Sequence, residues 1–216
     1  MQLKMRPKSK LVFFLLALGL FISAAWSPLG ITQASPLTET QLLQNPGFTS
    51  GSWSPWDNYG SSQLTNSLYH SDPYSLNFGD AVYGKIDDLV GQNVAIPLNT
   101  THISLSFWYQ TDTEEVAANA DKMCLGLYET DFSSAYAESC VDIGDEGSIT
   151  EWKQFTYDLP LADVLRVKDK TVMFGISFVT DWTLLSRGWV DTIALIVDDT
   201  PIPYTYTYLP MVMRKH

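Results

Sequence analysis

Short stretches in which apolar and polar residues alternate are the feature that most limits what this chain can fold into. The clearest one is 103–109, where Ile, Leu, Phe and Tyr occupy every second position and Ser, Ser and Trp lie between them. Successive side chains of a β-strand point to opposite faces, so this stretch predicts a strand with one face in a core. From Ser35 onward, no segment keeps a helical period over twelve residues.

Similar runs recur along the chain and are bounded by Gly, Pro, Asn and Asp, which favour turns. Beside 103–109, strands are predicted at 74–78, 90–96, 123–129, 136–143, 153–159, 171–178 and 189–197. One helical turn is expected at 161–167, where Pro160 can open it. This pattern predicts one all-β domain over 35–200, built as a two-sheet antiparallel sandwich.

The first 34 residues have the organisation of a secretory signal peptide. All four charged residues of 1–10 are basic, and an apolar run follows at 11–26. Small residues precede Ser35, so cleavage is expected after Ala34. The alternative is an uncleaved membrane anchor, although the apolar run is shorter than the roughly 20 residues that span a bilayer. Either way the rest of the chain is expected to be exported, as a secreted or cell-surface protein.

The charge of the chain narrows the range of partners. The sequence has 24 acidic and 13 basic residues, which gives a net charge of −11. Removal of 1–34 would take four basic residues and no acid, leaving a net charge of −15. Phosphate backbones require a basic face, so nucleic acid is not an expected partner. Neutral or cationic partners are favoured, and a membrane is expected to be contacted only through an uncleaved leader.

The two cysteines provide a test of strand register. If 123–129 and 136–143 form a hairpin that turns at 131–133, residues whose numbers sum to 264 face each other, as Cys124 and Cys140 do. Directly opposed Cβ atoms lie about 4.5 to 5.5 Å apart, which allows a disulfide in an oxidising compartment. The alternatives are two free thiols or a pair of metal ligands.

Four acidic doublets raise the question of glycoside hydrolysis, which needs two carboxylates facing one cleft. They lie at 87–88, 114–115, 145–146 and 198–199. Neighbouring residues of a strand point to opposite faces, so a doublet within a strand cannot supply both groups. An enzyme is therefore the less expected interpretation.

Aromatic residues on polar faces are the better functional signal. A sugar ring has an apolar C–H face and a hydroxyl rim, and a flat aromatic ring beside short polar side chains suits both. Trp108 shares its predicted face with serines, and the cysteine register places Tyr128 and Tyr136 together on the polar face of their hairpin. The alternative for Trp108 is burial under a loop. The predicted contact residues are Trp108, Tyr128 and Tyr136, with Trp56 and Tyr59 from the loops.

Several motifs, in order from 42 to 197, resemble those of jelly-roll, galactose-binding-like domains, which include many carbohydrate-binding modules of exported bacterial proteins. The matching stretches are Asn45-Pro46-Gly47-Phe48 with Gly51, Trp53 and Trp56; Ser71-Asp72-Pro73-Tyr74-Ser75-Leu76; Leu105-Ser106-Phe107-Trp108-Tyr109; Trp152 to Leu159; and Thr180-Asp181 with Trp189 to Leu195. The resemblance implies a jelly-roll sandwich and a non-catalytic module for neutral carbohydrate. The alternative from a different class is an adhesion or structural module that binds a surface protein.

The same resemblance raises one possible cofactor, a structural calcium ion. Family members often hold it with backbone carbonyls near the first strand, a Glu after the Phe, and the first Asp of the last strand. Here Asp191 is retained, but Thr49 stands at the Glu position. Calcium prefers six to eight oxygen ligands, so a site built on Asp191 and backbone carbonyls would have few ligands. The alternative is that Asp191 accepts hydrogen bonds from a neighbouring loop.

The last sixteen residues, 201–216, are predicted to form a tail outside the sandwich. They repeat Tyr-Thr and end in a short apolar stretch followed by basic residues. This ending resembles the tail of some bacterial exported proteins, for which surface retention is one interpretation. The apolar part is too short to span a bilayer, so a flexible end or an added edge strand are the alternatives.

Overall fold

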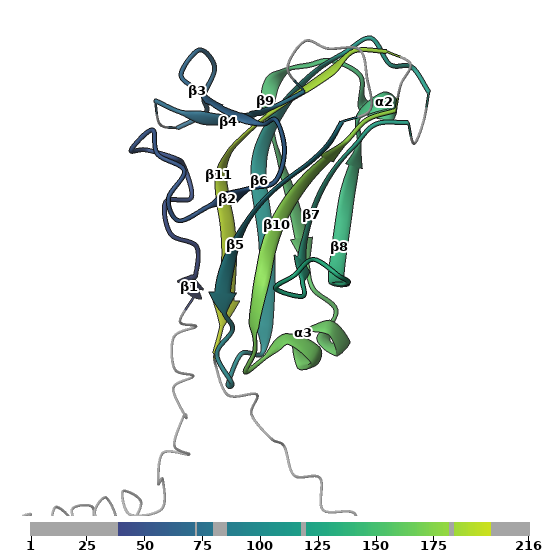
Figure 1. Ribbon diagram of the computed structural model, residues 1–216. Coiled ribbons are helices and arrows are strands. Elements are labelled where there is room, and N and C mark those ends of the chain that lie inside the picture. Colours follow the sequence, from purple (N-terminus) through teal and green to yellow (C-terminus); the bar gives the residue numbers. More distant parts are fainter. Residues whose placement is uncertain (1–38, 72, 80–85, 118–119, 182–183, 200–216) are drawn as a thin grey trace, which may run out of the picture. The chain divides into compact units, whose positions relative to one another are not determined.

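The structure is a computed structural model that describes residues 39–199, apart from 72, 80–85, 118–119 and 182–183. The predicted leader and the predicted C-terminal tail lie outside these residues. Two antiparallel sheets pack face to face, which confirms the all-β, two-sheet jelly-roll sandwich (Figure 1). Within the described ranges, no helix is long and apolar enough to cross a membrane.

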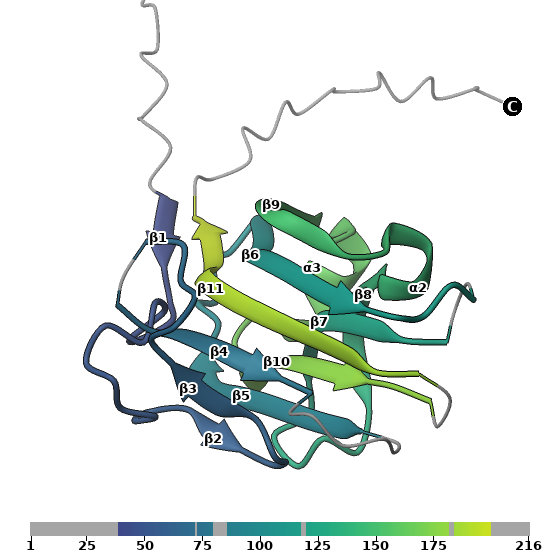
Figure 2. The same ribbon diagram turned by 90° about the horizontal axis from the view of Figure 1, so that it is seen from above.

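The first sheet, sheet A, has the strand order β3-β4-β11-β6-β9, with β1 paired to β11 as well. Figure 2 shows it as one of two layers. Its strands are β1 (Glu39–Gln41), β3 (Gln63–Thr65), β4 (Ser75–Phe78), β6 (His102–Thr113), β9 (Ile149–Asp158) and β11 (Ser186–Asp198).

The second sheet, sheet B, has the order β2-β5-β10-β7-β8, so among the described residues β8 is an edge strand that pairs with β7 alone. Its strands are β2 (Asp57–Asn58), β5 (Asp87–Ala95), β7 (Lys122–Tyr128), β8 (Ala135–Asp142) and β10 (Thr171–Val179). All eight predicted strands are present. The sequence did not reveal β1, β2 and β3, because two or three residues are too few to show an alternation.

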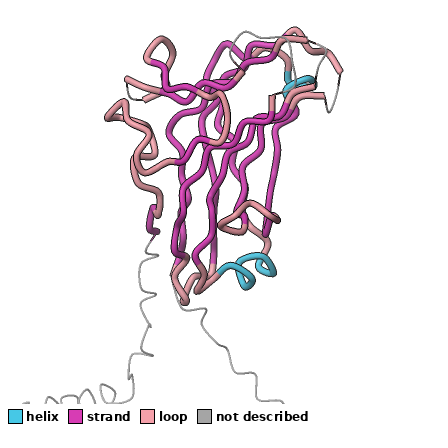
Figure 3. The backbone as a smooth tube through the Cα atoms, in the orientation of Figure 1, coloured by secondary structure: helices cyan, strands magenta, loops and turns pink. Residues whose placement is uncertain are grey.

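Two short helices join strands at opposite ends of the sandwich (Figure 3). α3 (Leu161–Val167) follows Pro160 and spans the predicted helical turn. α2 (Ile143–Glu146) was not predicted. Its N-cap is Asp142, whose carboxylate accepts the backbone N–H of Asp145 and so satisfies one of the free donors of the first turn.

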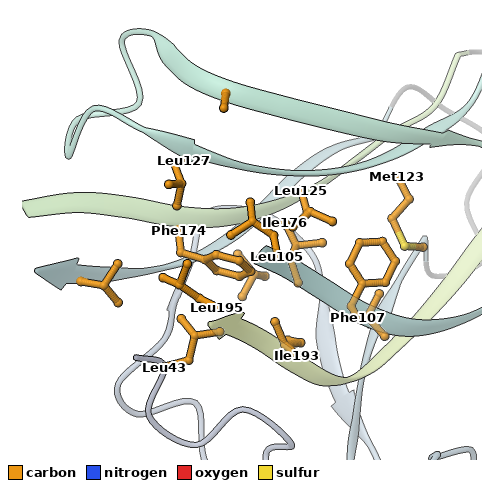
Figure 4. Packing of buried hydrophobic residues seen from close by; sticks show 14 of the residues in the cluster. Leu43, Leu105, Phe107, Met123, Leu125, Leu127, Phe174, Ile176, Ile193 and Leu195 are labelled. Carbon is orange, nitrogen blue, oxygen red and sulfur yellow. The ribbon is translucent and has the colours of Figure 1, made fainter. Parts of the chain in front are cut away.

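The core lies between the sheets, as the alternation in 103–109 predicts. Ile103, Leu105 and Phe107 of β6 are fully buried, and Leu125 and Phe174 reach them from sheet B (Figure 4). Burial of each such side chain contributes about 1.5 to 3 kcal/mol relative to its exposure. This packing fixes which side of each sheet faces solvent.

The hairpin of β7 and β8 has the predicted register, in which Cys124 faces Cys140. A disulfide joins them, so the alternatives of free thiols and of metal ligands are wrong. The register holds as far as Leu127 opposite Ala137 and then shifts by one residue. This bulge places Tyr128 opposite Ala135 instead of Tyr136, so the two tyrosines are not directly opposed.

Candidate functional site

Trp108 and the two tyrosines lie on different sheets. Trp108 belongs to β6 and points outward from sheet A, whereas Tyr128 lies on the outer face of sheet B and Tyr136 lies at the bulge of β8, packed against the core. The three residues, all predicted as contact residues, therefore do not form one surface. The reason is topological: β6 pairs with β11 and β9, and the cysteine hairpin pairs with β10.

The indole of Trp108 is covered by the chain itself. The imidazole of His70 stacks on it with a centroid distance of 4.1 Å and an interplanar angle of 13°. The ring of Trp152, from β9, meets the same imidazole edge to face at 5.7 Å. The alternative of a loop over Trp108 is the arrangement that the structure shows, and Trp108 does not offer an open platform.

Asp191 holds that loop in place. Its side chain is fully buried, and its Oδ2 accepts the backbone N–H groups of His70 and Ser71 at 2.8 and 3.0 Å. Its Oδ1 accepts the N–H of Thr192 at 2.6 Å. Three N–H groups thus point their positive ends at this carboxylate.

These contacts do not fit a structural calcium ion. The carbonyl oxygen of Asn45 accepts the indole N–H of Trp56, and that of Pro46 accepts the N–H of Ile193, so these oxygens are already hydrogen-bonded. A cation would compete with N–H donors at Asp191 and would lack the second carboxylate that Thr49 replaces. Asp191 is a loop anchor, in line with the alternative that the sequence left open.

Trp56 does not lie on the surface. Only 4% of it is exposed, and its ring packs against Phe48 and Phe174 with centroid distances of 5.5 and 6.0 Å. The prediction of Trp56 as a loop contact residue does not agree with this burial. The indole closes the core under the first loop, and its N–H bond to Asn45 satisfies its only polar group.

The outer face of sheet B contains a hollow of about 370 Å³. Side chains from four strands and from the turn between β7 and β8 surround it, which brings together segments more than 90 positions apart in the sequence. They are Asp87, Leu89, Lys122, Cys124, Tyr128, Phe132, Glu138, Cys140, Ser177 and Val179.

The strand register defines the floor of this hollow. Leu89, Ser177, Cys124 and Cys140 face one another in a row across β5, β10, β7 and β8. The floor is therefore mostly apolar, with one hydroxyl and with the disulfide at one end. Cys124 is 4% exposed, whereas Cys140 is an exposed residue.

An aromatic wall stands beside this floor. Tyr128 and Phe132 have a centroid distance of 5.5 Å, and Tyr59 meets Phe132 edge to face at 5.3 Å. A Cβ at Gly175 would lie 3.1 to 3.2 Å from the Tyr128 and Phe132 rings and from Leu89, so the missing side chain makes room for the wall. Phe132 has a φ of 58°, an uncommon backbone conformation that places its ring at this position.

Polar and charged groups surround the floor. The Tyr128 hydroxyl donates to Glu138 Oε2 at 2.8 Å, and burial together with this carboxylate raises the pKa of Tyr128 above its ordinary value. Lys122 and Asp87 lie at the end of the hollow away from the wall. They flank Val179 in one row across β7, β10 and β5. Among the described residues, no ion pair within 4.0 Å involves Lys122, Asp87 or Glu138. The charged groups of Lys122 and Asp87, and the Oε1 atom of Glu138, are therefore available to a ligand.

Of the five residues predicted as contacts, Tyr128 lines the hollow and Tyr59 flanks its wall. Tyr136 lies beyond it: Lys170 Nζ is 4.7 Å from the centre of its ring and Arg166 Cζ is 5.5 Å from it. Lys170 also donates to the Tyr136 hydroxyl at 3.3 Å. Tyr136 is therefore a support for two basic side chains.

Sequence reasoning missed Phe132 as a member of the site, because it lies in a turn and no strand pattern places its ring. Glu138 was detectable, since the cysteine register puts it on the same face as Tyr128. Asp87, Lys122 and Ser177 carry no local signal, because they come together only when β5, β10 and β7 pair.

No protein-family model and no curated protein sequence matches this chain. Solved structures do match. One, from a study of promiscuous specificity in carbohydrate-binding modules of the β-sandwich superfamily, has a TM-score of 0.50 at 16% identity, over 72% of this chain and 62% of its own. The enzymatically active domain of tailspike protein 4 of bacteriophage CBA120 has a TM-score of 0.51 at 11% identity. The match covers 73% of this chain and 21% of the tailspike chain. A family 61 carbohydrate-binding module in complex with β-1,4-galactotriose has a TM-score of 0.49 at 20% identity. The match covers 72% of this chain and 97% of that module. The chain thus shares the β-sandwich fold that carbohydrate-binding modules use.

Proposed function

We propose that this chain is a non-catalytic carbohydrate-binding module and that the hollow of sheet B holds a neutral oligosaccharide. The observation that carries the proposal is the combination in one hollow of an apolar floor, an aromatic wall and charged groups that form no ion pair among the described residues. A pyranose ring presents an apolar face to the floor and wall and a hydroxyl rim to the polar groups. The fold shared with carbohydrate-binding modules supports the same conclusion.

The charges of the hollow favour a neutral ligand over an anionic one. The hollow is lined by two carboxylates, of Asp87 and Glu138, and by one ammonium group, of Lys122. The chain as a whole has a net charge of −11. Both the local and the overall charge disfavour approach of uronate or sulfate groups. Neutral hydroxyls can both donate to the carboxylates and accept from the ammonium group.

The positions of the acids argue against hydrolysis. By the strand register, Asp87 and Glu138 are separated by four residues along the strands and by three strand spacings, which is about 14 Å in each direction. Glycoside hydrolases hold their two carboxyl groups about 5 to 10 Å apart. Asp88, the neighbour of Asp87, points inward and accepts hydrogen bonds from Ser61.

Export of the module is part of the proposal. The sequence at 1–34 resembles a signal peptide, and a disulfide persists in oxidising compartments such as the extracellular space. Sequencing the N-terminus of protein recovered from the culture medium is the direct check. A chain that starts at or near Ser35 is the expected result, and retention of Met1 in the membrane fraction would support the anchor instead.

Binding is tested by titration with cellohexaose, xylohexaose and mannohexaose. Phe132→Ala should weaken any binding at least tenfold, because truncation of a central aromatic contact costs about 2 kcal/mol. Gly175→Ala should weaken it as well, since the added Cβ pushes the wall into the hollow. Tyr59→Ala and Tyr69→Ala form a matched pair, because these tyrosines are 52% and 49% exposed and only Tyr59 flanks the wall.

Tyr69→Ala should leave the affinity unchanged, whereas Tyr59→Ala should lower it. Equal effects of the two substitutions would contradict placement of the site in sheet B. Failure of all three sugars to bind, combined with binding of a cell-surface protein through Phe132, would favour the adhesion alternative.

A further inference from the structure

The floor of the hollow has an unusual component, since one end of it is the Cys124–Cys140 disulfide. Building on the function proposed above, we propose that this disulfide is itself a ligand-contacting surface. The C–H face of a pyranose packs on its sulfur atoms. The thiol–disulfide state of this pair therefore sets the affinity of the site.

The chemistry of the floor suits this role. Sulfur is polarisable and weakly polar, so it makes dispersion contacts with C–H groups without requiring hydrogen bonds. Leu89 and the disulfide lie in one row across the sheet, with Ser177 between them. The exposed side of the disulfide belongs to Cys140.

The disulfide also determines what Glu138 can do. Glu138 Oε2 accepts the Tyr128 hydroxyl, and Oε1 lies 3.6 Å from Cys140 Sγ. A disulfide sulfur has no proton to donate, so this contact leaves Oε1 free to accept a ligand hydroxyl. In the part of the chain that the structure describes, no N–H or O–H group donates to Oε1.

Reduction changes both features at once. A dithiol reductant supplies two electrons and two protons, the S–S bond breaks, two thiols form, and the reductant becomes a cyclic disulfide. The Cys140 thiol then has a proton that it can donate to Glu138 Oε1, in competition with the ligand. The covalent link across the floor is also lost, and within the described ranges β8 is an edge strand with β7 as its sole neighbour in the sheet.

The test measures affinity for cellohexaose, xylohexaose and mannohexaose in three states of the full chain. These are the oxidised protein, the protein reduced with dithiothreitol, and the Cys124→Ser/Cys140→Ser double variant. Titrations are run well below the unfolding midpoint of each state, and circular dichroism checks that each is folded. The expected result is at least a fivefold loss of affinity on reduction and in the double variant.

His70→Ala serves as the control for stability, because it removes a contact on sheet A and leaves the hollow untouched. It should lower the unfolding midpoint without changing affinity. Equal affinity of the oxidised and reduced protein would overturn the inference while the proposed function stands. A loss of affinity that is proportional to the fraction of unfolded protein would overturn the inference too. Failure of the oxidised protein to bind any of the three sugars would contradict the proposed function itself, and the inference with it.

Discussion

The outer faces of sheet A and sheet B both carry aromatic side chains, but one face is closed and the other is open. On sheet A, the loop through His70 covers Trp108, and the buried carboxylate of Asp191 fixes that loop. On sheet B, Tyr128 and Phe132 form a wall and leave a hollow of about 370 Å³ beside them. An aromatic residue on a polar strand face therefore stays accessible only where no loop of the same chain is anchored over it.

Asp191→Ala should have the largest effect on the difference between the two faces, because it releases the loop that closes sheet A. The substitution leaves three backbone N–H groups without their acceptor, and hydrogen bonds to a charged group contribute about 1.5 to 3 kcal/mol each, so a loss of at least about 4.5 kcal/mol in unfolding free energy is expected. Urea unfolding measures it. Asp112→Ala, which removes an exposed acid of β6, is the matched control and should change stability little. Equal effects of both substitutions would show that Asp191 does not anchor the loop.

Removal of the disulfide should be the next largest effect, and it acts on the open face. The two cysteines are 16 positions apart, and a crosslink that closes a loop of about 15 residues stabilises a fold by about 3 kcal/mol. The Cys124→Ala/Cys140→Ala variant should lose this amount in urea unfolding. Wild-type protein in reductant should behave in the same way. A stable double variant with an unchanged midpoint would contradict this estimate.

His70→Ala should have a smaller effect, about 1 kcal/mol, because it removes one stacked ring pair at the surface. It should also uncover the Trp108 indole and so raise quenching of tryptophan fluorescence by acrylamide. The His70→Ala/Trp108→Phe variant identifies which indole is responsible. If quenching does not rise in His70→Ala, the closed state of sheet A does not depend on this imidazole.

The smallest expected effect is a dependence on pH at Asp121, which joins the two sheets. This side chain is fully buried and accepts the N–H of Asp181 at 2.9 Å and the hydroxyl of Ser186, at the start of β11. Burial, with further contributions from Asp181 and Glu115, raises the pKa of Asp121. The folded state therefore binds this proton more tightly than the unfolded state does. Stability should fall as the pH rises from the unfolded pKa through the raised folded pKa.

Asp121→Asn should lack this contribution. The unfolding free energy of the wild type minus that of the variant should therefore decrease as the pH rises across that interval. Urea unfolding at a series of pH values measures it. A difference that is constant with pH, or that grows, would contradict the raised pKa.

Local periodicity explains how much of the fold was predictable. The alternation in 103–109, the turn residues between runs and the sum rule for the cysteines depend only on neighbouring positions. They predicted eight strands, the helical turn of α3 and the disulfide. Each of these features is set by strand geometry and by the burial of alternate side chains.

The location of the site depended on the tertiary structure. The sequence by itself determined that Trp108 and Tyr128 point away from the core, because that follows from alternation within one strand. Which sheet each strand joins, and which loop covers it, was decided only by pairing between distant segments, such as Asp191 with the loop at His70. The hollow exists because β5, β10 and β7 pair and bring Leu89, Ser177 and Cys124 into one row. Such long-range contacts depend on the packing of the whole sandwich, and no single stretch of sequence encodes them.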